Sequence, residues 1–556
     1  MRTAILLVTL LGILPDANAL RAIDHVLTIG GGYAPEGNQA SLEANVQFFQ
    51  RVIAGTHNSS PPHRIHFADG HDPAADLQVL AKKQIPASPA VTLLEEIFGT
   101  PGSSEDRVTY RNHEVTDVAG SSRLRDLREG FDVVRGQLKA GDRLIIYVTA
   151  HGGSAKGNEP YDTSITCWGH RELSMREFST WLDTLPESVP VLLVMTQCYC
   201  GGFAHSLFAK GDIEEGLAAN VRTGFYAQRH DLPAAGCRPD VENDEEYSSF
   251  FWGAFIGHTR SGKVAADVDC DRDGSVSLAE AHAYAVVASQ TIDIPLRGSD
   301  ALLRIISRIP NYDVDDPDTE RQSKAGRSNA SADGPDNRNS ETDSDGNVVD
   351  RDASKFARKQ KTSAAAVSST TLVDMSGSIR ALANLGTPVE ERIITGLAEQ
   401  LNLGLSEDVG QVFEKYADAQ REYRSARRGG GQFGGRRGRS GFGRRRDVRE
   451  AILDHWPELE EQSTWPESDL LAGDAAVAFV KEVEMLPSYQ AYARGRDQRE
   501  ASRVATFEAE MKQVRFQRLI HTLESVVLAA NAKAVASPEM LRRYEAMVKL
   551  EQSAFR

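Results

Sequence analysis

The 556-residue sequence contains only five cysteines, and aromatic residues make up just 7% of it. Five cysteines are too few for a scaffold held together by disulfides, and an odd number leaves at least one thiol without an intramolecular partner. Positive charge is also in deficit, since 63 Lys and Arg face 79 Asp and Glu, which gives a net charge of −16. A field of that sign repels phosphate and argues against nucleic-acid binding through overall charge.

Long hydrophobic runs are missing after the N-terminus, so no later segment is expected to cross a membrane. A content of 40% hydrophobic and 26% charged residues is ordinary for globular proteins. It excludes a wholly disordered chain, a collagen-like repeat and a polytopic membrane protein. The length predicts two or three domains.

The N-terminus has the pattern of an export signal. Arg2 precedes an apolar run over residues 4–14, and Ala17-Asn18-Ala19 supplies the small-x-small pattern of a cleavage site. We therefore predict a signal peptide over residues 1–19, cleaved before Leu20. The mature protein is expected to be periplasmic or secreted, where disulfides are permitted.

The remaining chain divides by composition. Over residues 20–310, strand-like runs alternate with helical patterns, which predicts an α/β domain with a mostly parallel sheet. The expected strands include residues 25–29, 64–68, 144–148 and 189–195, and residues 123–138 read as an amphipathic helix. Residues 311–366 are polar and acidic and are expected to form a disordered linker.

Residues 367–556 have a helical pattern without a convincing strand, so we expect a separate all-α region. Val504, Phe507, Met511 and Val514 recur at helical spacing and are expected to lie in its core. A Gly/Arg-rich tract at 427–446 is expected to form a flexible basic loop between helices. Such a loop is open to proteolysis and offers a contact for an anionic surface.

Two predicted strands end in residues that can carry chemistry. The strand at 144–150 runs into His151-Gly152-Gly153, and the strand at 191–197 runs into Cys198. In a parallel sheet the carboxyl ends of the strands form the functional edge, so both residues are expected there. A histidine can take the thiol proton, and the thiolate is the nucleophile.

These residues resemble the signature of the caspase/legumain class, clan CD, of cysteine peptidases, and bacterial legumain-like members most of all. A His-Gly follows one hydrophobic strand, and a second such strand ends in x-Cys-x-x-Gly about fifty residues later. The resemblance covers residues 20–310 and implies a caspase-like three-layer sandwich. It also implies endopeptidase activity with His151 and Cys198 as the catalytic dyad, and an oxyanion hole formed by the N–H groups of Gly152 and Cys198.

The resemblance extends to the expected substrate pocket. Residues 246–252 resemble the Tyr-Ser-containing strand of legumain relatives, with Tyr247, Ser248 and Ser249 as substrate-binding residues. Residues 162–168 stand where these enzymes carry another pocket strand, and they include the candidate Asp162. For both segments, aromatic core packing is an equally open reading.

One position departs from the family pattern. Legumain-like enzymes have an acidic residue two positions before the cysteine, whereas this chain has the neutral Thr196. The preference for the residue before the scissile bond therefore stays open. A buried acid from elsewhere, such as Asp162, Asp231 or Glu246, could take that role.

Other roles for the cysteines remain open. Cys198 and Cys200 form a C-x-C pair that could act in redox control, although so short a loop strains a disulfide. Cys237 could pair with Cys167 or Cys270. His151 and Cys198 could also both be structural.

A calcium-binding pattern follows near the end of the same domain. Residues 269–280 match the twelve-position EF-hand loop, with hard oxygen ligands at the expected spacing. The predicted Ca²⁺ ligands are Asp269, Asp271, Asp273, Ser275, Ser277 and Glu280. The ion is expected to brace the fold, and an acidic turn that only caps the following helix is the simpler alternative.

The sequence thus predicts an exported, calcium-stabilised cysteine endopeptidase that acts on a protein or peptide and matures by self-cleavage. The alternative is a non-catalytic, calcium-binding envelope interaction protein on a peptidase-like scaffold. Two weaker patterns carry no prediction of function: the Gly-rich loop 30–37 fits no nucleotide-binding motif, and His63, His66 and His71 have no partners for a zinc site.

Overall fold

The computed structural model describes residues 22–56, 61–81, 88–99, 107–235, 246–307, 372–434 and 438–554. The predicted signal peptide, almost the whole predicted linker and Cys237 lie outside these residues. Within them, no helix is both long enough and apolar enough to cross a bilayer.

A nine-stranded, mostly parallel sheet forms the centre of the N-terminal part. Its main path runs in the order β11-β10-β9-β6-β1-β2-β5, and β7 and β8 extend from β6 as an antiparallel addition. The strands are β1 (Asp24–Gly31), β2 (His63–Phe67), β5 (Val118–Gly120), β6 (Arg143–Gly153), β7 (Ser164–Cys167), β8 (Arg171–Ser174), β9 (Val191–Met195), β10 (Arg222–Tyr226) and β11 (Leu296–Arg297).

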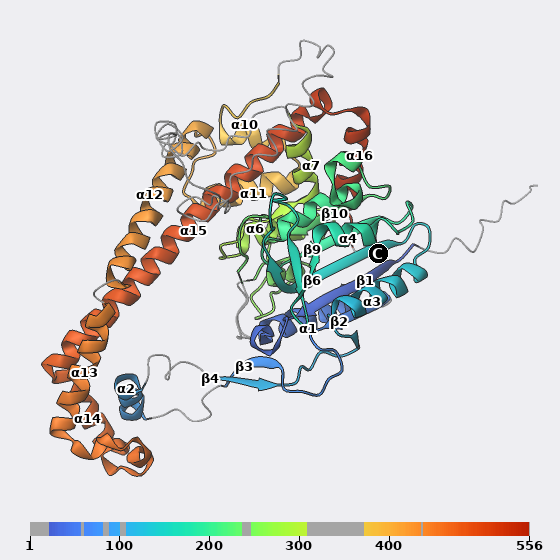
Figure 1. The fold of residues 1–556 in the computed structure, drawn as a ribbon. Coiled ribbons are helices and arrows are strands. Elements are labelled where there is room, and N and C mark those ends of the chain that lie inside the picture. The colour runs from blue at the N-terminus through green and yellow to red at the C-terminus, as the bar shows by residue number, and fades with distance from the viewer. Residues whose placement is uncertain are drawn as a thin grey trace, which may run out of the picture.

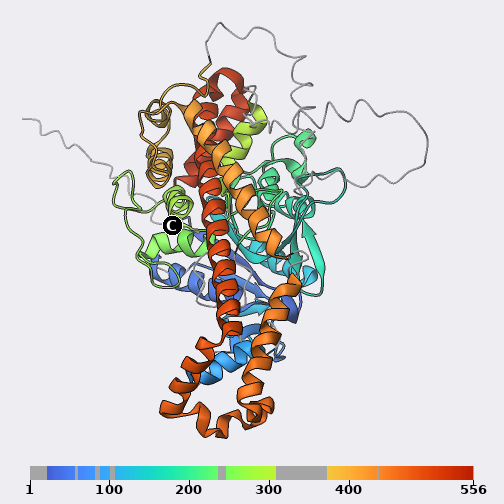
Figure 2. The ribbon, with the colours of Figure 1, turned by 90° about the vertical axis from the view of Figure 1, so that its left-hand side faces the viewer.

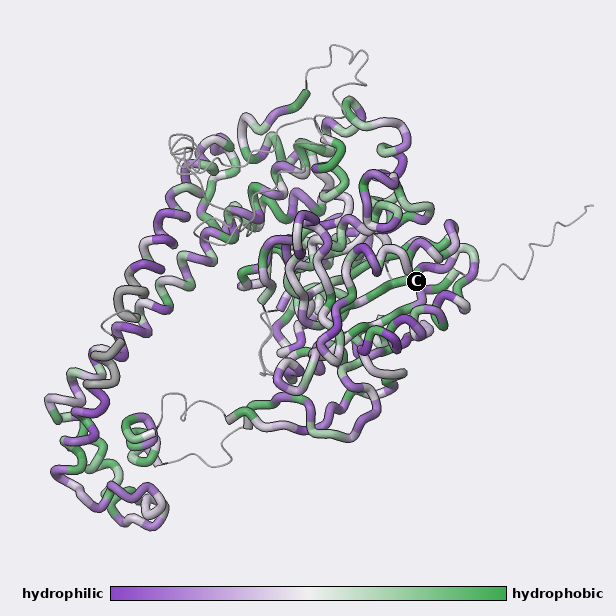
Figure 3. Tube along the Cα trace, viewed as in Figure 1, coloured by the Kyte–Doolittle hydropathy of each residue, from purple (hydrophilic) through white to green (hydrophobic). Residues whose placement is uncertain are grey.

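The sheet is buried because helices cover both of its faces. Every residue of β1 and β9 is buried, and the central strands are hydrophobic segments in the hydropathy trace (Figure 3). Tyr147 of β6 packs against Phe49 of α1 and Trp252 of α5, while Phe131 of α3 contacts Trp181 of α4. The covering helices are α1 (Ala40–Thr56), α3 (Leu124–Gln137), α4 (Met175–Leu182), α5 (Tyr247–Ile256), α6 (Leu278–Ala288) and α7 (Gly298–Ile306).

The strands predicted at 25–29, 64–68, 144–148 and 189–195 are confirmed, as is the helix at 123–138. The strand predicted at 246–252 is wrong, because these residues begin α5. The run is buried on all sides although it includes Glu246, Ser248 and Ser249, and a short buried run has no periodicity that separates strand from helix. Gly257, with φ of 79°, ends the helix in the left-handed conformation that glycine adopts easily.

The C-terminal part is largely helical (Figures 1 and 2). Its longest helix, α15, runs along most of the height of the molecule in Figure 2 and packs against α12. The helices are α10 (Ile379–Ala383), α11 (Pro388–Gln400), α12 (Val409–Gly434), α13 (Gly438–His455), α14 (Gly473–Met485), α15 (Pro487–Val535) and α16 (Pro538–Glu551).

The sequence suggested a separate helical part. In the structure this part shares apolar cores with the sheet domain. Ala279, Ala283 and Val286 of α6 pack with residues of α11, α12 and α15. Leu550 of α16 belongs to the main core of the sheet domain. Compositional patterns show where apolar residues lie but not which distant segment covers them, so the sequence could not show this docking.

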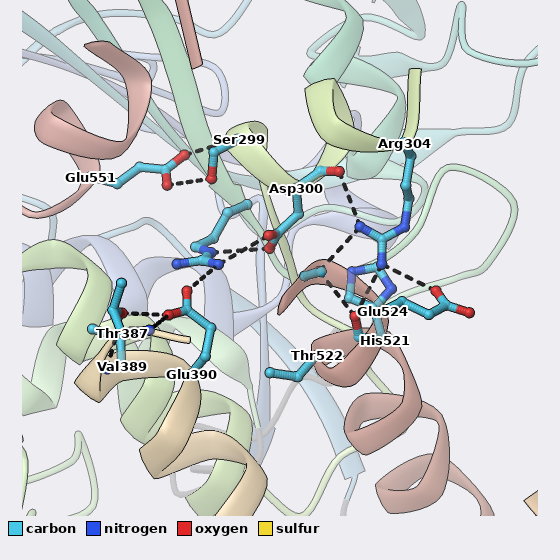
Figure 4. Close-up of polar contacts among 12 residues, drawn as sticks. Ser299, Asp300, Arg304, Thr387, Val389, Glu390, His521, Thr522, Glu524 and Glu551 are labelled. Carbon is cyan, nitrogen blue, oxygen red and sulfur yellow. Dashed lines mark hydrogen bonds and ion pairs between the residues drawn. The ribbon is translucent and has the colours of Figure 1, made fainter. Parts of the chain in front are cut away.

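Buried charges also join the two parts (Figure 4). Arg297 at the start of α7 pairs with Asp300 and with Glu390 of α11. Glu551 of α16 accepts hydrogen bonds from Ser299 and Thr223. Burial raises the pKa of Glu551 to about 7, and Arg297 opposes the shift.

A second contact lies at the far end of the long helices (Figure 1). The antiparallel pair β3 (Leu77–Ala81) and β4 (Arg107–Arg111) flanks α2 (Pro89–Phe98), which packs against α13 and α14. Residues of α2 share one apolar cluster with α13, α14 and the start of α15. An insertion from the sheet domain is therefore part of the distal helical cluster.

Two predictions for the helical part need correction. The tract 427–446 lies within α12 and α13 wherever it is described, instead of forming a loop. Arginine is a good helix former, and packing against α15 offsets the cost of the glycines. In the predicted stripe, Met511 and Val514 are buried, but Val504 and Phe507 are 45% and 43% exposed.

Candidate active site

His151 and Cys198 lie at the ends of neighbouring strands. Strands β6 and β9 are parallel, their register pairs Val148 with Met195, and His151 and Cys198 each lie three residues further on. The two strand ends touch, because a Cβ built on Gly152 would lie 2.0 Å from the carbonyl oxygen of Cys198. Only glycine allows so close an approach of the two backbones.

The His151 ring is held in one orientation by two acceptors. Its Nε2 lies 2.8 Å from the carbonyl oxygen of Gly37 and 2.9 Å from Oε1 of Gln39. A carbonyl oxygen only accepts, so Nε2 carries the proton and Nδ1 keeps its lone pair in the neutral ring. Tyr33 packs edge-on against the same ring, with centroids 5.2 Å apart.

Burial lowers the pKa of His151, because it disfavours the charged imidazolium, while the bond to Gly37 opposes the shift. The ring is therefore neutral near pH 7. A neutral imidazole with a free Nδ1 lone pair can accept a proton from a thiol.

Cys198 stands at a tight turn after β9, and its side chain is partly exposed. Its Sγ lies 3.3 Å from the backbone nitrogen of Ala234, which donates to it. The next residue, Tyr199, has φ of 60° and donates its N–H to the carbonyl of Leu232 at 3.0 Å. Positive φ is uncommon for a bulky residue, and the hydrogen bonds to Leu232 and Ala234 hold this turn in place.

The other described cysteines differ from Cys198. Cys167 and Cys200 are buried, and burial raises the pKa of both thiols, that of Cys167 to about 12. Cys270 is partly exposed, and burial together with Glu280 raises its pKa to about 12. No disulfide links any of the four cysteines in the described ranges, and the predicted partner Cys237 falls outside them.

The Cys200 side chain is hydrogen-bonded to the backbone of Gln228. Its Sγ accepts from the N–H of Gln228 at 3.2 Å and donates to the carbonyl of the same residue at 3.4 Å. The glycines that follow are required by close contacts: a Cβ on Gly201 would lie 2.8 Å from the Gln228 oxygen, and one on Gly202 would lie 2.3 Å from Thr163 Oγ1. These contacts explain why two small residues follow the C-x-C pair.

Thr196, which replaces the acidic residue of the family pattern, binds the backbone. Its hydroxyl and its N–H both donate to the carbonyl of Val148, each at 3.0 Å. Gln197 is fully buried, and neither atom of its amide has a hydrogen-bond partner. A Cβ built on Gly152 would lie 2.8 Å from Cγ of Gln197. The Gln197 side chain therefore packs directly against Gly152, where the two strands end.

The three acids considered for the substrate pocket already have partners. Asp162 accepts from the N–H of Arg176 at 2.9 Å, near the start of α4. Asp231 binds Arg229 through both oxygens, and Arg229 and His230 help lower the pKa of Asp231 against its burial. Glu246 pairs with Arg260 at 2.8 Å, with both side chains 4% exposed.

The predicted substrate residues Tyr247, Ser248 and Ser249 lie in the core behind the sheet, since all three are in α5 and buried. The Tyr247 hydroxyl lies 2.8 Å from Nδ1 of His282 in α6, and the Ser249 hydroxyl accepts from the Arg260 N–H. The predicted strand is therefore wrong, and the substrate-binding role of these residues stays a prediction. The segment at 162–168 does contain a strand, β7, whose Thr166 pairs with His151.

The predicted calcium loop has a compact geometry that fits a cation. Oxygen atoms of Asp269, Asp271 and Asp273 lie within 4.8 Å of one another, and Asp269 Oδ1 is buried without a hydrogen-bond partner. Gly274, at the sixth position, donates its N–H to Asp269 Oδ2 and has φ of 88°. This is the turn that an EF-type loop needs.

Glu280 at position 12 has a second task. It forms a capping box with Ser277 at the start of α6, and its Oε1 accepts from the N–H of Cys270 at 2.8 Å. Helix α5 ends at Ile256, so the loop has a following helix but no helix directly before it. The acidic-turn alternative and the calcium alternative thus share the same residues, and ion binding distinguishes them.

Sequence reasoning did not find Gln39, Gly37 or Ala234. Gly37 belongs to the Gly-rich loop that carried no functional prediction, and Gln39 and Ala234 belong to no recognisable motif. Their contacts depend on how loops from three strands meet at one edge. The one signal that the sequence offered for Gln39 was a polar residue in the loop between the first strand and α1.

Comparisons with known proteins give no family. No protein-family model matches the chain, and no curated protein sequence matches it significantly. One structural match is the crystal structure of protein GSU0716 from Geobacter sulfurreducens, at 10% identity and a TM-score of 0.25. It covers 42% of this chain and 80% of that one, and a likeness this weak carries no functional argument.

Proposed function

We propose that this chain is a cysteine endopeptidase of the caspase/legumain type, with Cys198 as nucleophile and His151 as the proton-transfer residue. One observation carries the proposal. Adjacent parallel strands end in an oriented, neutral imidazole and in a partly exposed thiol that accepts a backbone N–H. The contact of Gly152 with the Cys198 carbonyl joins the two strand ends.

The reaction follows from these groups. His151 takes the thiol proton, and Sγ attacks the carbonyl carbon of the scissile peptide bond, so that a C–S bond forms. The N–H groups of Gly152 and Cys198 are proposed to bind the oxygen as its negative charge develops. The C–N bond then breaks, and the leaving amine takes the proton from His151. Water hydrolyses the thioester, releases the carboxylic acid and restores the thiol.

Gln39 and Gly37 act through His151. Both accept from Nε2–H, so they fix the tautomer that leaves Nδ1 for proton transfer. This is the task that an orienting third group performs in catalytic triads. Gln39 is therefore a positioning residue in the proposed mechanism.

A calcium ion is proposed to brace the domain through Asp269, Asp271, Asp273, Ser275, Ser277 and Glu280. The buried, unpartnered oxygen of Asp269 and the clustered carboxylates support this. Calcium would neutralise these negative charges and fix the turn before α6. Adding EDTA should lower the melting temperature, and restoring Ca²⁺ should recover it; an unchanged melting temperature in wild type would leave only the capping role of Glu280.

The proposed setting is the periplasm or the exterior, with a protein or peptide as substrate and with self-cleavage as the route to the mature form. Intact mass of the purified protein, compared with Cys198→Ala, tests the self-cleavage. Identical fragments from both would dismiss it.

Labelling by an electrophilic peptide probe tests the proposed function. A peptidyl acyloxymethyl ketone should attach to Cys198 and be lost in Cys198→Ala, and His151→Ala should label far more slowly. Iodoacetamide, which needs no peptide-binding cleft, serves as the control reagent. Equal labelling of wild type by the peptide probe and by a probe without a peptide would instead favour the calcium-binding interaction protein.

A further inference from the structure

Helix α15 of the C-terminal part is bound tightly to a loop of the sheet domain. Arg518 of α15 is 2% exposed and donates all five of its N–H bonds to the last turn of α6 and the loop that follows it, residues 286–293. The acceptors are the carbonyls of Val286, Ser289, Thr291 and Asp293 and the hydroxyl of Thr291, at 2.8–3.2 Å. Such complete pairing makes Arg518 a fixed point of the interface.

The same loop holds the segment that contacts the nucleophile. Asp293 is buried, and its Oδ1 accepts from the N–H of Ala235 at 2.8 Å. Gln228 is also buried, and its amide binds Ile294 N–H and the carbonyls of Pro233 and Ile292. Residues 292–294 and 233–235 are thus joined by side chains that are both buried and hydrogen-bonded.

Apolar packing follows the same path. Met511 and Val514 of α15 form a buried cluster with Ile294, and Leu232 and Ile292 pack against that cluster. Leu232 is the residue whose carbonyl accepts from Tyr199, directly after the nucleophile. Helix α15 therefore lies behind the segment 232–235 through both polar and apolar contacts.

We propose that Arg518 is a positioning residue for Cys198: through Asp293 it fixes the segment whose Ala234 N–H donates to the thiolate. This inference rests on the proposed function in taking Cys198 as the nucleophile, and it assigns to the C-terminal helical part a role in setting thiol reactivity. The Ala234 N–H, 3.3 Å from Sγ, stabilises the thiolate more than the thiol, and it lies closer to the sulfur than the Ala234 carbonyl, which accepts from the thiol at 3.8 Å. Loosening the segment removes that donor and makes the thiol harder to ionise.

The chain offers variants that separate positioning from folding. Arg518→Lys keeps the positive charge but has only three donors for five acceptors. Asp293→Ala removes the acceptor for Ala235, whereas Asp293→Asn keeps an oxygen at that position. Lys512 lies on the same helix as Arg518, and Lys512→Ala, which removes an exposed ion pair with Glu422 of α12, serves as the matched control.

The experiment measures the rate of iodoacetamide alkylation of Cys198 between pH 5 and 10 in full-length protein, with the labelled site identified by mass spectrometry. Circular dichroism checks folding of each variant. We expect Arg518→Lys and Asp293→Ala to raise the apparent thiol pKa by about one unit and to slow alkylation at pH 7 about tenfold. Asp293→Asn and Lys512→Ala should remain close to wild type.

Unchanged alkylation profiles in folded Arg518→Lys and Asp293→Ala would overturn the proposal. So would an equal shift in Asp293→Asn, because the oxygen acceptor would then not matter. If Arg518→Lys does not fold, the comparison of Asp293→Ala with Asp293→Asn still tests the link from Asp293 through Ala235 to the thiol, and equal profiles of these two variants would overturn the proposal. Alkylation needs no substrate, so a protein that shows these shifts but cleaves no peptide would refute the proposed function and leave this inference standing.

Discussion

Gly152→Ala tests whether the contact between the two strand ends matters for function. A Cβ at position 152 would lie 2.0 Å from the Cys198 oxygen and 2.8 Å from Gln197 Cγ. Ordinary contacts between such atoms need about 3.5 Å, so the backbones must separate by roughly 1.5 Å. The alanine therefore moves the nucleophile away from His151 without removing any catalytic group.

The expected effect on rate is large and the effect on stability moderate. A misplacement of about 1 Å in a catalytic site costs on the order of 100-fold in rate. Overpacking of this kind costs about 1–3 kcal/mol of unfolding free energy. Because His151 and Cys198 are unchanged, we expect kcat to fall by about two orders of magnitude while the protein remains folded.

Gly136→Ala is the matched control. It makes the same substitution in α3, where a Cβ would meet nothing within 4 Å. Peptide hydrolysis and urea unfolding of both variants are measured beside wild type. Wild-type kcat in Gly152→Ala would refute the argument that this contact sets the site geometry, and an equal loss in Gly136→Ala would show that the effect is not local.

Three further predictions concern charge and pH. Gln39→Glu places a carboxylate 2.9 Å from His151 Nε2 and should move the His151-dependent limb of the kcat/KM profile to higher pH, whereas an unmoved limb would mean that Gln39 does not bind this ring. Asp24→Ala leaves the buried Arg143 without its charged partner and should lower the unfolding free energy by about 3–5 kcal/mol, whereas Glu500→Ala, which breaks an exposed pair, should cause no comparable loss; equal losses would contradict the burial argument. Burial lowers the pKa of His282 to about 3, so as pH falls the unfolded state binds a proton at this residue before the folded state does. Between pH 7 and 4 this difference should lower the unfolding free energy of the protein by about 3 kcal/mol. The difference in unfolding free energy between wild type and His282→Gln should shrink by that amount as pH falls, and a constant difference would refute the assignment of a neutral His282.

Sequence reasoning succeeded where local pattern decides structure. Strands β1, β6 and β9 read as buried runs of branched residues, and the glycines after His151 and Cys198 marked the ends of strands. Because β6 and β9 are neighbours in register, equal offsets from Val148 and Met195 bring both residues to one edge. That result needed only the parallel sheet and the lengths of two strands.

Sequence reasoning failed where tertiary contacts decide. Residues 247–254 are buried on every side, so neither period is visible in the sequence, and the helix packs against α1 and α6. Gln39 reaches His151 from another strand connection, and Arg518 reaches its acceptors from a helix more than two hundred residues away in sequence. No spacing rule predicts a pairing between segments so distant.

Hydrolysis of a fluorogenic peptide library varied at the residue before the scissile bond tests the central claim most directly. Wild type and Cys198→Ala would be assayed side by side with Ca²⁺ and a reductant. The proposed mechanism predicts cleavage by wild type alone, with a preference at that position that Thr196 does not fix. Absence of cleavage by folded, mature wild type, or equal cleavage by both proteins, would contradict it.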